Sequence, residues 1–375
     1  MLESHKSETT GSDTDLTVPY ITPDLPGIGG QLRATTDHFV VEELPLYGPT
    51  DEGQHLYINL TKEGMTTRDV AGKLAQIFGV SEKQVGFAGM KDKHARTTQT
   101  LSVNVGHVDA AFVADVPQRV MDSLPVTVHW ARLHGNKLKP GHLIGNRFTI
   151  TVTDLAIPGG DALAQAEAIA ERLRAVGLPN YFGPQRLGIK GDNVRRGLAI
   201  VQGKRYVKDR WLRRLMISSY QSYLCNRYLA HRVETGNFER ILTGDVAKKY
   251  ETGGMFQVED GETEQPRYAA HEITFTAPIY GPKMWDATGP SGELEQAVWA
   301  TADITLEQLA KTRMKGTRRL GRLLVPDLSV RPAADNPEHL VVEFSLLKGA
   351  YATTVLGEIM KVDLTYVPGA GSGEE

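Results

Sequence analysis

The stretch GFAGMKDKHARTTQTLSVNV, residues 86–105, joins a charged turn to a strand. Gly86 and Gly89 fit a turn because glycine adopts backbone angles that other residues avoid. After residue 99 apolar and polar side chains alternate, and a period of two predicts a strand with one buried face. The turn therefore presents its charged residues at the beginning of a strand, where a rigid scaffold can aim them.

Asp92 is the candidate catalytic residue of this turn. It lies between Lys91 and Lys93, and Arg96 follows. Nearby cations favour the ionised form of a carboxylate, which suits a nucleophile or a base better than a general acid. His94 could also act as a base, although a histidine in a basic turn is more often exposed or a phosphate contact. A solvated surface turn has the same composition, so the turn alone leaves both interpretations open.

Length and composition indicate a soluble protein with two domains. The chain has 375 residues, of which 41% are hydrophobic and 23% charged, enough for two separate cores. Its single cysteine, Cys225, excludes an intrachain disulfide framework and a cysteine-based zinc site. The polar N-terminal stretch lacks the apolar centre of a signal peptide, and no apolar run has the length of a membrane span. We therefore expect a cytoplasmic protein without membrane contact.

Positive charge is clustered although the net charge is −3. Residues 186–214 contain ten Lys or Arg against two Asp, and residues 311–322 contain six basic residues and no acid. Nucleic-acid binding depends on such local clusters because they neutralise phosphates. Two solvated helix faces would have the same composition, so composition does not decide between these interpretations.

The order of the predicted elements indicates one α+β domain interrupted by another. Residues 1–25 are polar and predict a disordered arm. Strands and helices then follow without the regular alternation of a doubly wound parallel sheet. Residues 179–325 are more helical and more basic. We therefore predict a discontinuous domain of residues 26–178 and 326–368, an inserted domain of residues 179–325, and a flexible tail of residues 369–375.

Several elements can be placed from local patterns. Strands at 39–41 and 56–60, joined by a link with turn composition, suggest an antiparallel hairpin. Thr66 and Asp69 predict a capping box for a helix that ends at Gly79. We predict further strands over 126–133, 146–154 and 340–345, and helices over 161–176, 211–233, 293–302 and after Gly349.

The remaining chemistry favours RNA. The chain has no phosphate-binding GxxxxGK[ST] loop, no HExxH motif and no GxSxG elbow. Aromatic rings near strand ends and turns can stack on an unpaired base, or they can pack in the core. These rings are Phe39, Phe148, Tyr181, Phe182 and Tyr351. The residues therefore favour an RNA enzyme in which Asp92 supplies the catalytic carboxylate.

The segment GFAGMKDKHARTTQ closely resembles the signature G-x-KD-x-x-A-x-T-x-Q of the tRNA pseudouridine synthase D (TruD) family. The matching residues are Gly89, Lys91, Asp92, Ala95, Thr97 and Gln99. Further motifs follow in family order: DHFVVEE at 37–43, GNRF at 145–148, PNYFGPQRLG at 179–188, YQSYLCN at 220–226 and KGAYATTVLGE at 348–358. The resemblance extends from about residue 26 to residue 365.

This resemblance implies both a fold and a reaction. The fold is the pseudouridine-synthase fold, a mixed and largely antiparallel sheet with helices, interrupted by a family-specific inserted α+β domain. The reaction is the isomerisation of a uridine in tRNA, typically at position 13, to pseudouridine. It uses base flipping and neither cofactor nor metal. The expected partner is tRNA, and we expect a monomer.

The resemblance also assigns the site residues. Asp92 matches the essential aspartate, which attacks the sugar C1′ or, alternatively, the base. Arg33 matches its basic partner and could hold the carboxylate bidentately. The substrate contacts implied are Phe39, Asn146, Phe148, which would lie on the target base, and Tyr351. For the RNA backbone we predict contacts from Lys91, Lys93, Arg186, Arg195, Arg196, Arg318 and Arg319.

Some positions depart from the family pattern. Leu187 and Cys225 stand where relatives often have Phe, which exchanges one apolar side chain for another. Gly357 stands where relatives often have Arg, so a phosphate or structural contact is in doubt there. Two other functions would fit the same surfaces. A non-catalytic RNA-binding protein or chaperone would not need Asp92, and a base-releasing N-glycosidase would admit water and produce free uracil.

Overall fold

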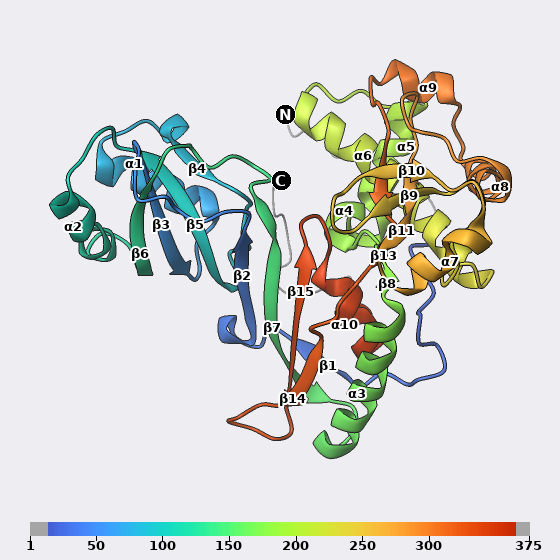
Figure 1. The fold of residues 1–375 in the computed structure, drawn as a ribbon, viewed down its shortest axis with the longest axis horizontal. Helices are drawn as coiled ribbons and strands as arrows, with labels where there is room; N and C mark the ends of the chain where they lie inside the picture. The colour runs from blue at the N-terminus through green and yellow to red at the C-terminus, as the bar shows by residue number, and fades with distance from the viewer. Residues whose placement is uncertain (1–13, 365–375) are drawn as a thin grey trace, which may run out of the picture. The chain divides into compact units, whose positions relative to one another are not determined.

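The computed structural model describes residues 14–364 and divides them into two compact units. One unit consists of residues 20–181 and 322–364, and the other of residues 14–19 and 182–321 (Figure 1). The boundaries predicted at residues 179 and 326 lie near these transitions. Residues 1–13 of the predicted arm, residues 365–368 and the predicted tail lie outside the described residues.

The first unit contains a nine-stranded sheet in which the order of the main strands is β14-β15-β7-β2-β5-β3-β6. β2 and β5 run parallel, and the other neighbours run antiparallel. This arrangement confirms the predicted α+β class with a mixed, largely antiparallel sheet. The strands are β1 (Gly29–Leu32), β2 (Phe39–Pro45), β3 (His55–Lys62), β4 (Val85–Phe87), β5 (Arg96–Asn104), β6 (Val126–His134), β7 (Leu143–Leu155), β14 (Ser329–Pro332) and β15 (Leu340–Leu347). A separate short pair joins β8 (Leu178–Pro179) and β13 (Arg322–Leu323).

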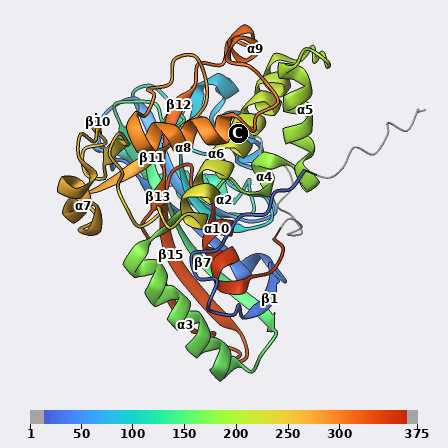
Figure 2. The same ribbon diagram turned by 90° about the vertical axis from the view of Figure 1, so that its right-hand side faces the viewer.

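Helices bury the apolar residues of this sheet in two clusters. The helices α1 (Thr67–Phe78) and α2 (Ala110–Met121) pack with the alternating apolar residues of β3 and β5. The helices α3 (Gly159–Val176) and α10 (Ala352–Met360) pack with β7 and β15, and Figure 2 shows them beside these strands. Short 3-10 helices span Thr36–His38 and Glu82–Gln84.

The structure confirms the predicted start and end of α1. The Thr66 hydroxyl accepts a hydrogen bond from the Asp69 N–H at 3.1 Å, and the Asp69 carboxylate accepts one from the Thr66 N–H at 2.8 Å. Without these bonds, both backbone N–H groups would be unpaired donors at the helix N-terminus. Gly79 ends the helix with a φ of 65°, a left-handed conformation that costs glycine little.

The predicted hairpin of β2 and β3 is wrong. β5 lies between these two strands, parallel to β2 and antiparallel to β3. Its central position also explains why Thr100 and Ser102 are buried together with Leu101 and Val103, so that β5 is covered on both faces and not on one. Local alternation predicts a strand, but it does not say which strand inserts between two others.

Two further local predictions need correction. Gly86 does not adopt a positive φ; glycine is needed there because a Cβ atom would collide with the carbonyl oxygen of Leu138. Residues 20–25 are not a disordered arm. The backbone N–H groups of Ile21 and Thr22 donate to the Glu358 carboxylate at 2.7 and 3.3 Å, and Thr22 is fully buried. The buried acceptor lies more than 300 residues away in sequence, so local polarity could not reveal it.

The second unit combines helices with a four-stranded sheet of order β10-β9-β11-β12 that the sequence patterns did not predict. Its long helix α6 places Arg232 in a fully buried ion pair with Asp245 at 2.7 Å. The strands are β9 (Val246–Lys249), β10 (Met255–Gln257), β11 (Ile273–Ile279) and β12 (Thr317–Leu320). The helices are α4 (Pro184–Leu187), α5 (Asp192–Val201), α6 (Arg210–Glu234), α7 (Gly261–Ala269), α8 (Gly289–Trp299) and α9 (Leu306–Lys311), with a 3-10 turn at Ile189–Gly191.

We expect alanine to have opposite effects on stability at two glycine positions. A Cβ atom at Gly145 would meet the carbonyl oxygen of Leu346 across the β7–β15 pair, whereas a Cβ atom at Gly357 in α10 meets nothing within 4 Å. We expect Gly145→Ala to lower the free energy of unfolding by about 1–3 kcal/mol through overpacking. Gly357→Ala should raise it by about 1 kcal/mol because alanine favours the helix. Denaturant unfolding of the two variants measures both changes, and an unaffected Gly145→Ala protein would contradict the close approach of the strands.

Candidate active site

One face of the sheet carries a row of side chains that crosses five strands. Lys62 of β3 lies opposite Thr97 of β5, Thr97 lies beside Val41 of β2, and Val41 lies opposite Phe148 of β7. Phe344 of β15 continues the row. Because side chains alternate along a strand, residues two positions away share this face. The site is therefore assembled from strands that are distant in sequence.

A second row runs beside the first. Glu43 lies opposite Asn146, and Asn146 lies opposite Leu346. Gln99 is two residues beyond Thr97 and extends this row onto β5. The loop 88–94 lies next to these rows, because its Lys91 side chain reaches Glu43 and the Lys91 N–H donates to the Thr67 hydroxyl.

Asp92 is held in this loop by two donors. The Arg33 Nη1 donates to Asp92 Oδ2 at 2.6 Å, and the His94 N–H donates to Asp92 Oδ1 at 2.9 Å. The Asp92 side chain is 24% exposed and the Arg33 side chain only 6%. The two residues predicted to pair are thus in contact, but through one nitrogen–oxygen contact and not through the bidentate pair that was expected. One donor to each oxygen orients the carboxylate while leaving it accessible.

Phe39 supports Arg33. The guanidinium carbon lies 4.0 Å from the centroid of the Phe39 ring, a cation–π contact. Arg33 itself has a φ of 63°, an uncommon conformation for a residue other than glycine. Conformations of this kind persist only where the surroundings hold them. The face of Phe39 is therefore used to position the arginine that holds Asp92.

Phe148 and Tyr351 differ in their surroundings. Phe148 is buried, stacks on Phe344 with 5.3 Å between ring centroids, and meets Phe39 edge-on at 6.5 Å. Tyr351 is half-buried and is the N-cap residue of α10. It follows β15 at the end where that strand is paired with Gly145 and Asn146.

The lysine and arginine residues that flank Asp92 in sequence have other partners. Lys91 forms a buried ion pair with Glu43 at 2.7 Å, and both side chains are at most 5% exposed. Arg96 pairs with Asp37 at 2.8 Å. The prediction that Lys91 contacts the RNA backbone is therefore wrong, because a buried and paired ammonium cannot reach a phosphate. Lys93 is exposed.

Lys62 is a functional candidate that sequence reasoning missed. Its ammonium donates to the carbonyl oxygens of Met65 at 2.7 Å, Asp92 at 2.9 Å and Lys91 at 3.4 Å. Burial lowers the pKa of Lys62 from 10.5 to about 8, while the Asp92 carboxylate opposes this shift. The sequence contains one signal: Lys62 continues the row of buried side chains Leu56, Ile58 and Leu60.

Four buried polar atoms next to the loop have no hydrogen-bond partner among residues 14–364. Buried polar groups are usually paired, and an unpaired one costs about 1–3 kcal/mol. These atoms are Arg33 Nε, Thr97 Oγ1, Gln99 Nε2 and Asn146 Oδ1. The site therefore offers both donors and an acceptor to a polar ligand beside the Asp92 carboxylate.

Several basic residues predicted to contact RNA lie in the other unit and have partners there. Arg318 is 1% exposed and paired with Glu295 at 2.6 Å, so its predicted RNA contact is wrong. Arg195 and Arg196 both pair with Asp192. Arg186 donates to the Ser218 hydroxyl at 2.6 Å, and the Arg319 guanidinium lies 3.9 Å from the centroid of the Phe182 ring.

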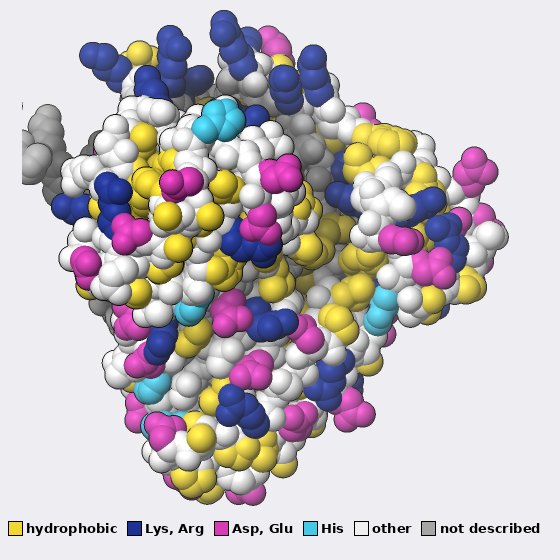
Figure 3. Space-filling model, turned by 60° about the vertical axis from the view of Figure 1, so that its left-hand side comes forward, with side chains coloured by type: hydrophobic (Ala, Val, Ile, Leu, Met, Phe, Trp, Pro, Cys, Tyr) yellow, Lys and Arg dark blue, Asp and Glu magenta, His cyan; other side chains and the backbone are white. Residues whose placement is uncertain are grey.

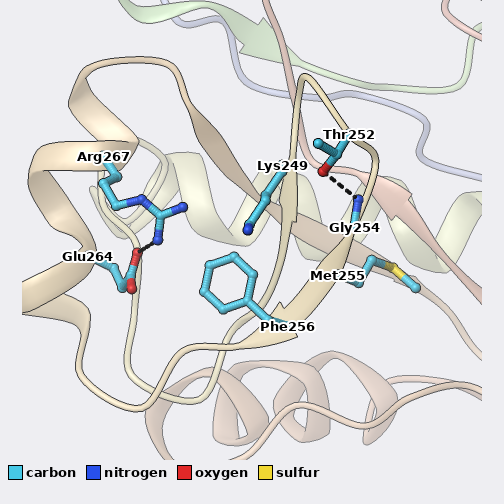
Figure 4. A pocket seen from close by; sticks show the side chains of 7 residues that line it. All are labelled: Lys249, Thr252, Gly254, Met255, Phe256, Glu264 and Arg267. Atoms are coloured by element: carbon cyan, nitrogen blue, oxygen red, sulfur yellow. Dashed lines mark hydrogen bonds and ion pairs between the residues drawn. The ribbon is translucent and has the colours of Figure 1, made fainter.

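A cavity of about 270 Å³ in that unit contains none of the predicted site residues. It lies between the β9–β10 hairpin and α7 (Figure 4), and Glu264 pairs with Arg267 in its wall at 2.6 Å. The lining residues are Lys249, Thr252, Gly254, Met255, Phe256, Glu264 and Arg267. The residues gathered around Asp92 therefore form a site distinct from this cavity.

The model of the family described as tRNA pseudouridine synthase D (TruD) matches residues 15–207 and 205–359. The chain belongs to the TruD family. A protein from Anaeromyxobacter dehalogenans named tRNA pseudouridine synthase D is 43% identical over 359 residues, covering 93% of this chain and 98% of its own. A Thermus thermophilus protein of the same name is 42% identical over 346 residues and 92% of both chains.

A solved TruD structure has the same fold. The crystal structure of a TruD-family protein from Methanosarcina mazei superposes with a TM-score of 0.76 at 27% identity, covering 92% of this chain and 96% of its own. The match spans both units. Among the described helices of this TruD protein, none combines the length and the apolar composition needed to cross a membrane.

The buried Lys62 of this TruD protein predicts a pH dependence of stability. The pKa of Lys62 is about 8 in the folded state and 10.5 when exposed. At pH values between 8 and 10.5, Lys62 therefore holds a proton in the unfolded chain that it lacks in the folded chain. Raising the pH from 8 to 10.5 therefore favours folding. Below pH 8 the lysine is charged in both states and its full burial cost is present.

We expect the stability of the wild type relative to Lys62→Met to increase by roughly 2–3 kcal/mol over this pH range, since one pKa unit corresponds to about 1.4 kcal/mol. Denaturant unfolding at a series of pH values measures this difference. Lys73→Met, at an exposed position of α1, is the control and should show no such slope. A difference between wild type and Lys62→Met that does not change with pH would contradict a desolvated ammonium.

Proposed function

We propose that this protein is a tRNA pseudouridine synthase, an isomerase that converts a uridine of tRNA, at position 13, to pseudouridine. Its membership of the TruD family supports the reaction class. The observation that carries the proposal is the Asp92 carboxylate, partly exposed and oriented by Arg33 and His94 at 2.6 and 2.9 Å. This geometry suits a nucleophile that must attack without a prior change of its own position.

In this mechanism Asp92 attacks the ribose C1′ of the target uridine. The N1–C1′ bond breaks and its electron pair leaves with the uracil. The detached uracil turns, C5 forms a bond to C1′, and Asp92 leaves as a carboxylate. The proton on C5 is then lost and N1 gains one, so the product has the same atoms as the substrate. Because the substrate and product are isomers, the reaction involves no net oxidation or reduction and needs no redox cofactor.

Arg33 and Lys62 serve this step in different ways. Arg33 holds one carboxylate oxygen of Asp92, and the Phe39 ring holds Arg33. Lys62 binds the main chain at Lys91 and Asp92. We therefore propose Phe39 as a positioning residue, in place of the direct substrate contact that the family resemblance suggested.

The target base must leave the RNA stack to reach Asp92. Flipping a base costs a few kcal/mol, which stacking and hydrogen bonds in the enzyme must offset. We propose that Phe148 and Tyr351 contact the flipped uracil and that Asn146 Oδ1, which is buried and unpaired among the described residues, accepts the uracil N3–H. Lys93, Arg186, Arg195, Arg196 and Arg319 remain predicted contacts of the RNA backbone.

The central test replaces the carboxylate by an amide. Asp92→Asn keeps the shape of the side chain and removes the nucleophile, so we expect pseudouridine in tRNA to disappear while tRNA binding is retained. Chemical mapping of tRNA incubated with each protein measures pseudouridine formation. A filter-binding assay measures tRNA binding. Asp51→Asn is a matched control, because Asp51 is an exposed carboxylate paired with Arg132.

Three outcomes of this experiment would contradict the proposal. An active Asp92→Asn protein would show that Asp92 is not the nucleophile. Free uracil released by the wild type would indicate an N-glycosidase that admits water. Binding of tRNA by the wild type without any modification would favour a non-catalytic RNA-binding protein on the same fold.

We expect the reaction to be slower when Arg33 is replaced. A hydrogen bond to a charged group contributes about 1.5–3 kcal/mol, so Arg33→Met should lower the single-turnover rate by roughly 10- to 150-fold. Arg33→Lys keeps the charge but lacks the planar group that stacks on Phe39, and we expect an intermediate rate. Rapid-quench measurement with saturating protein gives the single-turnover rates of both variants. If Arg33→Met reacts at the wild-type rate, the Arg33–Asp92 hydrogen bond has no role in the chemistry.

A further inference from the structure

The segment that connects α5 to α6 concentrates positive charge. Residues 203–214, GKRYVKDRWLRR, contain six basic residues and one acid. The acid is Asp209, whose side chain caps α6 by accepting a hydrogen bond from the Leu212 N–H at 2.8 Å. The six basic residues are Lys204, Arg205, Lys208, Arg210, Arg213 and Arg214.

Within residues 14–364 these six side chains have no compensating acid. None of them forms an ion pair there, and all except the half-buried Arg213 are exposed. Three other basic residues of this unit behave differently, since Arg195 and Arg196 pair with Asp192 and Arg318 pairs with Glu295. The charge of residues 203–214 is therefore available to an external anion.

Figure 3 shows Lys and Arg side chains projecting together at the upper edge of the view, the end at which α5 and α9 lie in Figure 1. Charges gathered in this way raise the local concentration of a polyanion and neutralise several of its phosphates at once.

Aromatic side chains lie among these charges. Tyr206 is 86% exposed, which leaves nearly the whole ring in contact with water, and Trp211 is 47% exposed. Keeping a large apolar ring in water gains nothing for folding. Alternating cations and exposed rings are the combination used to bind single-stranded nucleic acid, where cations follow the backbone and rings stack on bases.

We propose that residues 203–214 bind the RNA substrate, with Lys204, Lys208 and their basic neighbours on the phosphates and Tyr206 stacked on an unpaired base. This inference rests on the proposed function, because it takes tRNA as the partner. RNA fits this surface better than an acidic protein does. The exposed ring can stack on an unpaired base, and the cations around it can bind the phosphates. The surface would add a binding region within the inserted unit.

The phosphate contacts are tested by salt dependence. Removing one lysine–phosphate pair should reduce the slope of log affinity against log salt by about 0.7–0.9. We expect Lys204→Glu/Lys208→Glu in the full chain to bind tRNA more weakly and to reduce the slope by roughly 1.4–1.8, because two such pairs are removed. The control is Lys73→Glu/Lys83→Glu, which makes the same change in net charge at two exposed lysines of the other unit. Equal slopes for the wild type and the first variant would overturn the proposal.

The stacking contact is tested separately at Tyr206. Stacking of a base on an aromatic ring is worth about 1–3 kcal/mol, so Tyr206→Ala should weaken tRNA binding by roughly 5- to 150-fold with an unchanged salt slope. Tyr206→Phe keeps the ring and should bind within about twofold of the wild type. Because Tyr206 is exposed, neither change should affect folding, and circular dichroism checks this. Wild-type affinity of Tyr206→Ala would overturn the stacking contact.

These results are separable from those that test the reaction. If the wild type forms pseudouridine but the variants in residues 203–214 bind tRNA normally, the reaction stands and this surface proposal fails. If the variants lose tRNA binding while the wild type forms no pseudouridine, the surface stands and the proposed reaction fails.

Discussion

The contact between Arg33 and Asp92 joins two segments that are 59 residues apart in sequence. Arg33 follows the short edge strand β1, and Asp92 lies in the loop before the central strand β5. Each partner depends on a further support: the Phe39 ring holds the guanidinium, and Lys62 and Thr67 bind the main chain of the loop. The carboxylate is therefore oriented by the sheet itself, through residues from β2 and β3 as well as from its own loop.

This arrangement places several charges in a region of low solvent exposure. Removing a charge from water is costly unless it is paired or hydrogen-bonded, and each buried charge near the loop satisfies this condition. Lys91 pairs with Glu43, and Lys62 donates to three carbonyl oxygens. Four buried side-chain atoms near the loop are unpaired among the described residues, among them Asn146 Oδ1 and Gln99 Nε2. Unsatisfied polar groups next to a partly exposed carboxylate are more typical of a binding site than of a folding core.

The basic residues of the inserted unit have two different roles. Arg232 and Arg318 are buried and paired with Asp245 and Glu295, so their charge serves the fold of this unit. The basic residues of 203–214 have no such partner among the described residues and remain exposed. A count of Lys and Arg along the chain cannot separate these groups, because the difference lies in burial and in the position of an acid distant in sequence. For the same reason the net charge of −3 does not exclude RNA as a partner.

Local patterns in the sequence were sufficient for α1 with its capping box, for most strand and helix positions, for the α+β class, and for the motifs that identify the family. Each of these depends on residues a few positions apart, whose spacing decides which side chains share a face or cap a helix. Tertiary structure alone decided that β5 lies between β2 and β3, that Lys91 is buried in an ion pair with Glu43, and that Lys62 holds the Asp92 loop. Strand order and the partner of a charged side chain depend on contacts between distant segments, and the periodicity of a single segment contains no information about them.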